Sequence, residues 1–140
     1  MLELKFDDGV QEINLNGKVT VWLNLADINF IERFFNAFDA MDAMNDKYKA
    51  ALENCKENKE LFAVAHDMDS EMRSLIDDAF GAPISEQLFG GLSTYSAASG
   101  LPVWCNLMLS VIDEMSDNMA AEKKATNPKL QKYLAKYKKN

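Results

Sequence analysis

The chain has 140 residues, of which 48% are hydrophobic and 26% charged, a balance typical of one globular domain with a packed core. Its formal net charge of −7 at pH 7 argues against nucleic acid and anionic membranes as partners. No apolar run approaches the about eighteen residues of a membrane span, and residues 1–9 lack a signal-peptide pattern, so we expect a cytoplasmic protein.

The first 24 residues have the pattern of short β-strands. "LELKF" (2–6), "VQEINL" (10–15) and "KVTVWL" (18–23) each alternate apolar and polar side chains. Asp-Asp-Gly and Asn-Gly separate them, and both are typical of tight turns. We predict a β-hairpin or a three-stranded meander. It must pack on the helices that follow, because two or three short strands are marginally stable alone.

A seam of apolar residues at helical spacing begins after Asp27, the expected N-cap, with Asn24 as a competing cap. Residues 56–60, "KENKE", are polar but contain neither glycine nor proline, so the pattern fits one very long helix or a helical hairpin. The seam holds Ile31, Phe34, Phe38, Met41, Asn45, Tyr48, Leu52 and Cys55 before that segment, and Leu61 or Phe62, Ala65, Met68, Met72, Leu75 or Ile76, and Ala79 after it.

Residues 80–91, "FGAPISEQLFGG", contain Phe-Gly twice. Gly81 is expected to end the long helix in the left-handed conformation. Ser85 is the expected N-cap of a short helix that Gly90 ends. Phe80 and Phe89 would anchor that short helix against the longer ones.

The same glycines do not fit a phosphate-binding loop. No Gly-x-Gly-x-x-Gly or Gly-x-x-x-x-Gly-Lys pattern occurs, and no basic residue lies between Arg73 and Lys123. Residues 90–100 are small and polar, so we expect the most mobile loop of the domain there.

A further amphipathic helix should start near Leu101-Pro102 and carry the apolar residues from Val103 to Met115, before "TNP" (126–128) interrupts it. Residues 122–140 hold seven lysines and one acidic residue, whereas residues 1–121 hold eight basic and 21 acidic residues. We therefore predict an α+β, mostly α domain over 1–121: a hairpin or meander followed by long amphipathic helices. A Lys-rich C-terminal helix or tail follows over 122–140, and an acidic body with a basic tail permits self-association.

Groups that could perform chemistry are scarce. The single histidine, His66, cannot build a histidine-rich metal site. Cys55 and Cys105 are expected to be reduced, buried thiols. Four aspartates resemble a carboxylate cluster but fit no calcium or iron motif, and they are expected to form a solvated helix face; they are Asp67 and Asp69, next to His66, and Asp77 and Asp78. We therefore expect neither an enzyme nor a cofactor or metal, and an enzyme seeded by His66, Asp77 and Asp78 is the least favoured alternative.

Methionines fill cores, but they are also frequent at adaptable binding surfaces, and the basic tail could contact an acidic partner. The candidate partner-binding residues are Met41, Met44, Met68, Met72, Trp104, Met108, Lys132, Tyr133 and Lys136.

The stretch "LIDDAFGAPISEQLFGG" (75–91) resembles the acidic-x-x-Phe-Gly…Ser-x-x-x-Phe-Gly signature of the small tail assembly chaperones of long-tailed bacteriophages that infect Gram-positive bacteria. The order of elements is similar as well, with "VWCNLMLSVIDEM" (103–115) as the later amphipathic helix and "KLQKYLAKYKK" (129–139) as the Lys-rich end with its Lys-Tyr pair. The chain departs from the family at 82–84, where Ala-Pro-Ile replaces a segment that tends to hold glycine and threonine.

The resemblance implies a non-enzymatic protein of the bacterial host cytoplasm. Such chaperones coat the long helical tape-measure protein, keep it soluble and help to recruit tail-tube subunits, and many are also made as a longer frameshifted product. An apolar seam between helices is compatible with binding a long helix. The alternative is a non-enzymatic helical interaction or structural module of phage or prophage origin.

Overall fold

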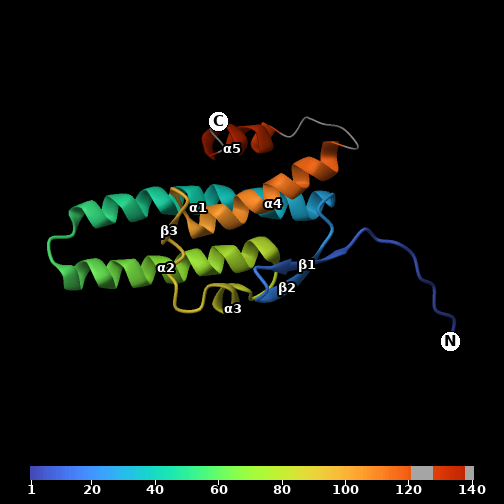
Figure 1. The fold of residues 1–140 in the computed structure, drawn as a ribbon, viewed down its shortest axis with the longest axis horizontal. Helices are drawn as coiled ribbons and strands as arrows, with labels where there is room; N and C mark the ends of the chain where they lie inside the picture. Colours follow the sequence, from blue (N-terminus) through green and yellow to red (C-terminus); the bar gives the residue numbers. More distant parts are fainter. Residues whose placement is uncertain (121–127, 138–140) are drawn as a thin grey trace.

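The computed structural model describes residues 1–120 and 128–137 (Figure 1). It confirms the predicted class, a mostly helical α+β fold in which an antiparallel hairpin precedes long helices and a short C-terminal helix. The elements are β1 (Gln11–Leu15), β2 (Val19–Leu23), α1 (Ile28–Asn54), α2 (Asn58–Phe80), α3 (Ser85–Phe89), β3 (Ala97–Ala98), β4 (Leu101–Pro102), α4 (Val103–Ala120) and α5 (Pro128–Tyr137).

The hairpin β1–β2 forms around the predicted Asn-Gly turn. Asn16 and Gly17 both have positive φ, 55° and 71°, which gives the turn the twist that antiparallel strands need. Ile13 pairs with Val21 and Leu15 with Val19, so one face of the hairpin is apolar and packs on the core.

The predicted strand at residues 2–6 does not form. Residues 1–10 lie outside any strand and lead away from the body (Figure 1). The side-chain amide of Asn24 donates to the Asp8 carbonyl at 2.8 Å and so holds the chain where it leaves the hairpin. The segment does alternate apolar and polar residues, but no strand among the described residues pairs with it.

Residues 27–80 form a helical hairpin rather than one long helix (Figure 1). Asp27 is the N-cap of α1, as predicted, and its carboxylate accepts from the Asn29 amide at 3.1 Å. Cys55 and Glu57 are extended, so the chain turns within the polar segment without a glycine or proline. The two helices then lie antiparallel with their apolar seams facing each other.

The seam residues of the proximal half, near the start of α1, form the core. Phe34, Phe38 and Met41 of α1 are fully buried. They pack in one cluster with residues of α2 and α4, which include Met72, Ile76, Trp104, Met108 and Ile112. Asn45 is the polar residue in the apolar seam of α1. A residue of α4 explains its presence there, because the Trp104 indole donates to the Asn45 side-chain oxygen at 3.2 Å.

The helix predicted near residues 101–102 begins at Val103, after the small β3–β4 hairpin. Residues 126 and 127 of the predicted "TNP" interruption lie outside the described residues, as does the predicted domain boundary at 121–122. Pro128 is the first residue of α5, a position that proline favours because its missing N–H would have no helical partner.

Candidate interaction site

The first Phe-Gly pair ends α2 as predicted. Gly81 adopts the left-handed conformation (φ 65°, ψ 26°). A side chain at this position would also crowd Arg33, whose Nη2 lies 3.2 Å from where a Cβ would stand. The adjacent Phe80 is 4% exposed and Phe89 is 9% exposed. Both phenylalanines therefore hold the α2–α3 junction against the core, which confirms the predicted anchors.

Ser85 is not the N-cap of α3, which corrects the sequence prediction. The capping position belongs to Ile84, and its side chain makes no capping bond. Instead the Asp77 carboxylate of α2 accepts from the Ile84 amide at 2.9 Å, the Ser85 amide at 2.8 Å and the Ser85 hydroxyl at 3.1 Å. One acidic side chain thus caps the next helix, and Asp77 does not belong to a solvated acidic face.

Asp69 is likewise a structural residue rather than a solvated one. It accepts from the Thr94 amide at 2.7 Å and from the Thr94 hydroxyl at 2.6 Å, and it pairs with Arg73 at 3.0 Å. Burial acts to raise the pKa of Asp69, but the bonds from Thr94 and the Arg73 charge outweigh it, so its pKa is lowered.

Arg73 completes this arrangement by holding the segment that was expected to be mobile. Its Nη2 donates to the Gly90 carbonyl at 2.7 Å and to the Leu92 carbonyl at 2.8 Å. Together Asp69 and Arg73 fix residues 90–94 on α2, so the expectation of a mobile loop at 90–100 is wrong in this part. The sequence holds a signal for this, because Arg73 is the only lysine or arginine between Lys59 and Lys123 and follows Asp69 by four positions.

The candidate partner-binding residues divide into three groups. Five are core residues that a partner does not reach in this structure: Met41, Met72, Trp104, Met108 and Tyr133 are each at most 1% exposed. Met44 and Met68 are half-buried on α1 and α2. Lys132 and Lys136 are exposed on α5, but each contacts an aspartate of the same chain.

The helix α5 docks on α1 through alternating charge and aromatic contacts. Lys136 Nζ lies 2.6 Å from Asp42, and Lys132 Nζ lies 3.6 Å from Asp39. The Tyr133 ring stacks on Phe38 with 4.0 Å between centroids, and its hydroxyl donates to Asp39. The basic tail therefore neutralises acidic side chains of its own chain while it is docked.

The docking of α5 changes the pKa of Asp42, the acidic side chain that pairs with Lys136. Burial acts to raise the pKa of Asp42, but hydrogen bonds from Lys136 and Tyr137 and the charges of Lys136 and Lys132 outweigh it, so that its pKa is lowered. Because the carboxylate form is the one that α5 binds, docking depends on Asp42 being ionised.

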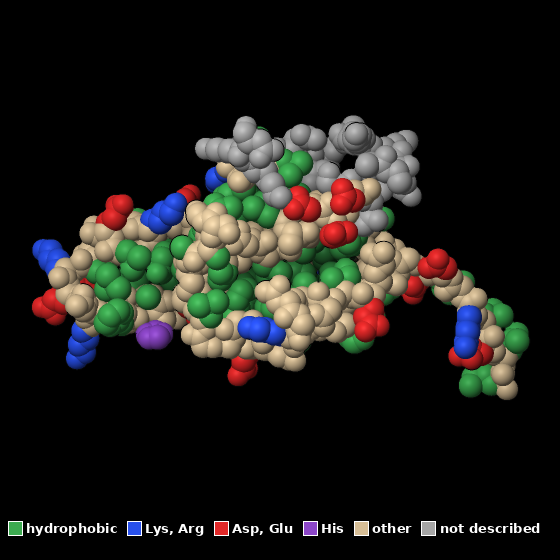
Figure 2. All heavy atoms as spheres, viewed as in Figure 1, with side chains coloured by type: hydrophobic (Ala, Val, Ile, Leu, Met, Phe, Trp, Pro, Cys, Tyr) green, Lys and Arg blue, Asp and Glu red, His purple; other side chains and the backbone are tan. Residues whose placement is uncertain are grey.

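The distal half of the α1–α2 hairpin, next to the turn between the two helices, is not covered by α4 as the proximal half is. α4 starts beside Asn45 and runs toward the start of α1, so it does not cover the turn between α1 and α2 (Figure 1). Hydrophobic side chains gather on the surface at this uncovered end (Figure 2). We call this surface the distal patch; its residues are half-buried except for Phe62, which is 58% exposed, and they are Met44, Tyr48, Leu52, Leu61, Phe62, Ala65 and Met68.

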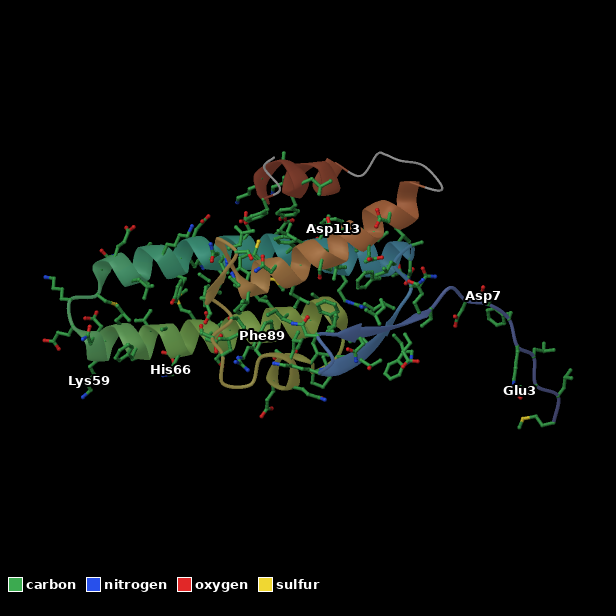
Figure 3. All side chains as sticks on the ribbon, viewed as in Figure 1. Glu3, Asp7, Lys59, His66, Phe89 and Asp113 are labelled. Atoms are coloured by element: carbon green, nitrogen blue, oxygen red, sulfur yellow. The ribbon has the colours of Figure 1, made fainter. Side chains whose placement is uncertain are left out.

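Reactive side chains do not converge elsewhere in the part of the chain that the structure describes. His66 is exposed on the outer side of α2 (Figure 3). Within residues 1–120 and 128–137, no three residues of His, Cys, Asp or Glu are placed to hold a metal ion. Cys55 is half-buried and Cys105 is buried; neither is in a disulfide, and burial raises the pKa of the Cys105 thiol to about 12.

None of the helices in these described residues combines the length and the apolar run that a bilayer crossing requires. Comparison with known proteins adds no relative: no family model, no curated protein and no solved structure matches this chain.

Proposed function

We propose that this protein is a tail assembly chaperone of a long-tailed bacteriophage, which binds the helical tape-measure protein and helps to recruit tail-tube subunits in the host cytoplasm. The observation that carries the proposal is the distal patch. An apolar seam between two long helices is left half-exposed where the covering helix α4 stops. Such a seam is the surface into which an amphipathic helix packs its own apolar face.

The composition of the distal patch also supports a helical client. Met44 and Met68 lie on opposite helices of the hairpin, and flexible thioether side chains adapt to different apolar partners. A long helical client would present different segments to the same site, so a binding site for it must tolerate variation. The exposed aromatic ring of Phe62 supplies a large apolar contact at the edge of the same patch.

The arrangement of the remaining elements is compatible with the proposal. The hairpin, the long helices, the break at Gly81 and the basic helix α5 follow one another in the order that the chaperone resemblance implies. We infer that the protein acts by binding rather than by catalysis.

Co-expression with the tape-measure protein of the same phage genome tests the proposal. The expected result is that this protein keeps the tape-measure protein soluble and co-elutes with it on size exclusion. The double variant Phe62→Glu/Ala65→Glu should abolish this, because it places two charges in the distal patch. Trp22→Glu, at a 64% exposed residue of β2, is the matched control and should behave like the wild type.

Two outcomes contradict the proposal. If the tape-measure protein stays insoluble and no complex forms, the chaperone function is wrong, and a structural or interaction module without affinity for that helix is favoured. If a complex forms but both variants retain it equally, the client binds elsewhere and the distal patch is not the site.

A further inference from the structure

The hairpin β1–β2 leaves an open edge beside α4. A groove of about 820 Å³ lies there, lined by all five residues of β1 and, on the side of α4, by residues that include Asn106, Leu107 and Ser110. Successive side chains of a strand point to opposite faces, and the groove touches residues on both faces of β1, so it reaches the open edge of this strand. Among the described residues, β1 pairs with no strand other than β2.

The N-terminal segment has the pattern of a strand that lacks a partner. Leu2, Leu4 and Phe6 are 83%, 78% and 84% exposed, and Glu3 and Lys5 alternate with them. The segment projects from the body and carries hydrophobic side chains at its end (Figure 2), with Glu3 and Asp7 visible along it (Figure 3). Single exposed apolar residues are ordinary, but three alternating apolar residues on an unpaired extended segment can associate with another sheet edge.

The connection at Asp8 and Gly9 directs this segment away from the groove of its own chain. Asn24 holds the Asp8 carbonyl at 2.8 Å. The Gly9 amide donates to the Asp7 carboxylate at 2.9 Å, and the Val10 amide donates to the Asp8 carboxylate at 3.0 Å. To reach its own groove, the segment would have to reverse direction within these few bonded residues. The segment leads away from the body (Figure 1), so it does not fill the groove of its own chain.

We propose that residues 2–6 of one copy add as a third strand to the β1 edge of a second copy, with Leu2, Leu4 and Phe6 seated in its groove. Main-chain hydrogen bonds to the open edge would supply affinity, and the alternating side chains would supply register. The occupant is a second copy because the segment and the groove that fits it belong to the same sequence.

An antiparallel register fits the side chains of both partners. Placing Leu4 opposite Ile13 extends the existing Ile13–Val21 pair into a row of three apolar residues. The same register places Lys5 opposite Glu12, which forms a cross-strand pair of opposite charge on the outer face.

In that register Leu2 lies opposite Leu15 and extends the Leu15–Val19 pair in the same way. Every apolar residue of the segment then faces the groove, and every charged one faces solvent. Each copy offers one donor segment and one acceptor groove, so the exchange closes as a reciprocal dimer or continues as an open chain of copies.

The first test compares oligomeric state by size exclusion with light scattering over a range of concentrations. The wild type should exceed the monomer mass, and Leu2→Ser/Leu4→Ser/Phe6→Ser should reduce it to the monomer. Glu3→Gln, which changes the alternate face of the same segment and leaves Lys5 in place, is the control and should associate. A wild type that stays monomeric at every concentration overturns the proposal, including the case in which the segment closes on its own groove. Unchanged association of the triple serine variant also overturns it.

The second test separates donor from acceptor. Ser110 is exposed on α4 and lines the groove, so Ser110→Arg should block the acceptor without disturbing the core; circular dichroism checks that both variants fold. Each variant alone should be monomeric. Mixing the triple serine variant, which keeps its groove, with Ser110→Arg, which keeps its segment, should restore a 1:1 heterodimer. Failure of this mixture to associate would show that the segment and the groove do not bind each other.

Discussion

Replacing Asp77 by alanine tests whether one carboxylate caps α3 and holds it to α2. The variant removes the acceptor of three hydrogen bonds, from the Ile84 amide, the Ser85 amide and the Ser85 hydroxyl, which lie at 2.9, 2.8 and 3.1 Å. Ile84 is 2% exposed and Ser85 is 4% exposed, so their freed donors do not reach water readily. The cost should therefore exceed that of an ordinary surface substitution.

The magnitude follows from the number of donors and the charge of the acceptor. A hydrogen bond to a charged group contributes about 1.5–3 kcal/mol to stability. Two of the donors share one carboxylate oxygen, and contributions within one network do not add. We therefore expect Asp77→Ala to lower the free energy of unfolding by about 3 kcal/mol, which corresponds to a fall in melting temperature of about 10 °C for a domain of this size.

Urea unfolding followed by circular dichroism measures this cost, and two neighbouring variants calibrate it. Ser85→Ala removes only the hydroxyl bond and should cost about 1 kcal/mol. Asp78→Ala changes an exposed side chain and should stay within about 0.5 kcal/mol of the wild type. If Ser85→Ala cost as much as Asp77→Ala, or if Asp77→Ala matched Asp78→Ala, Asp77 would not be the cap and the assignment would be refuted.

Two further predictions concern the other acidic side chains. Asp69→Ala leaves the Thr94 amide and hydroxyl, in a residue that is 0% exposed, without their acceptor, so amide hydrogen exchange between α3 and α4 should accelerate at least tenfold; unchanged exchange there would contradict the role of Asp69. The lowered pKa of Asp42 means that its contribution to α5 docking is complete above its unfolded pKa of about 3.9 and is lost as the pH falls through the lower folded value. Near-ultraviolet circular dichroism of the tyrosines should show that loss in the wild type, and Asp42→Asn should show it already at neutral pH; identical acid profiles for the two proteins would contradict it.

The long helices could be predicted because their signal is local. Apolar residues at helical spacing and the single glycine at position 81 determine where α2 ends, whatever surrounds it. The turn at residues 55–57 could not be predicted in the same way, because no glycine or proline marks it. It is visible only once the two seams are seen to pack on each other.

Two aspartates have structural roles that the sequence does not reveal, because their partners are distant in sequence. Asp69 binds Thr94 and Asp77 binds Ser85, and in the sequence both acids look like members of a solvated helix face. The prediction that the methionines bind a partner was wrong for the buried ones, for a related reason. Met41 lies in the apolar seam of α1 and Met44 lies one turn further along the same helix, but Met41 is buried in the cluster that α4 joins and Met44 remains half-exposed. Periodicity identifies an apolar face but not the element that covers it.

The distal patch is the surface that we propose to bind a helical client. Hydrogen exchange of the protein with and without a candidate tape-measure protein, the proposed client, measures this binding directly. We expect slower exchange in the distal halves of α1 and α2, over residues 44–68, and little change in the proximal core. Protection confined to other elements, or no protection in a complex that demonstrably forms, would contradict the claim.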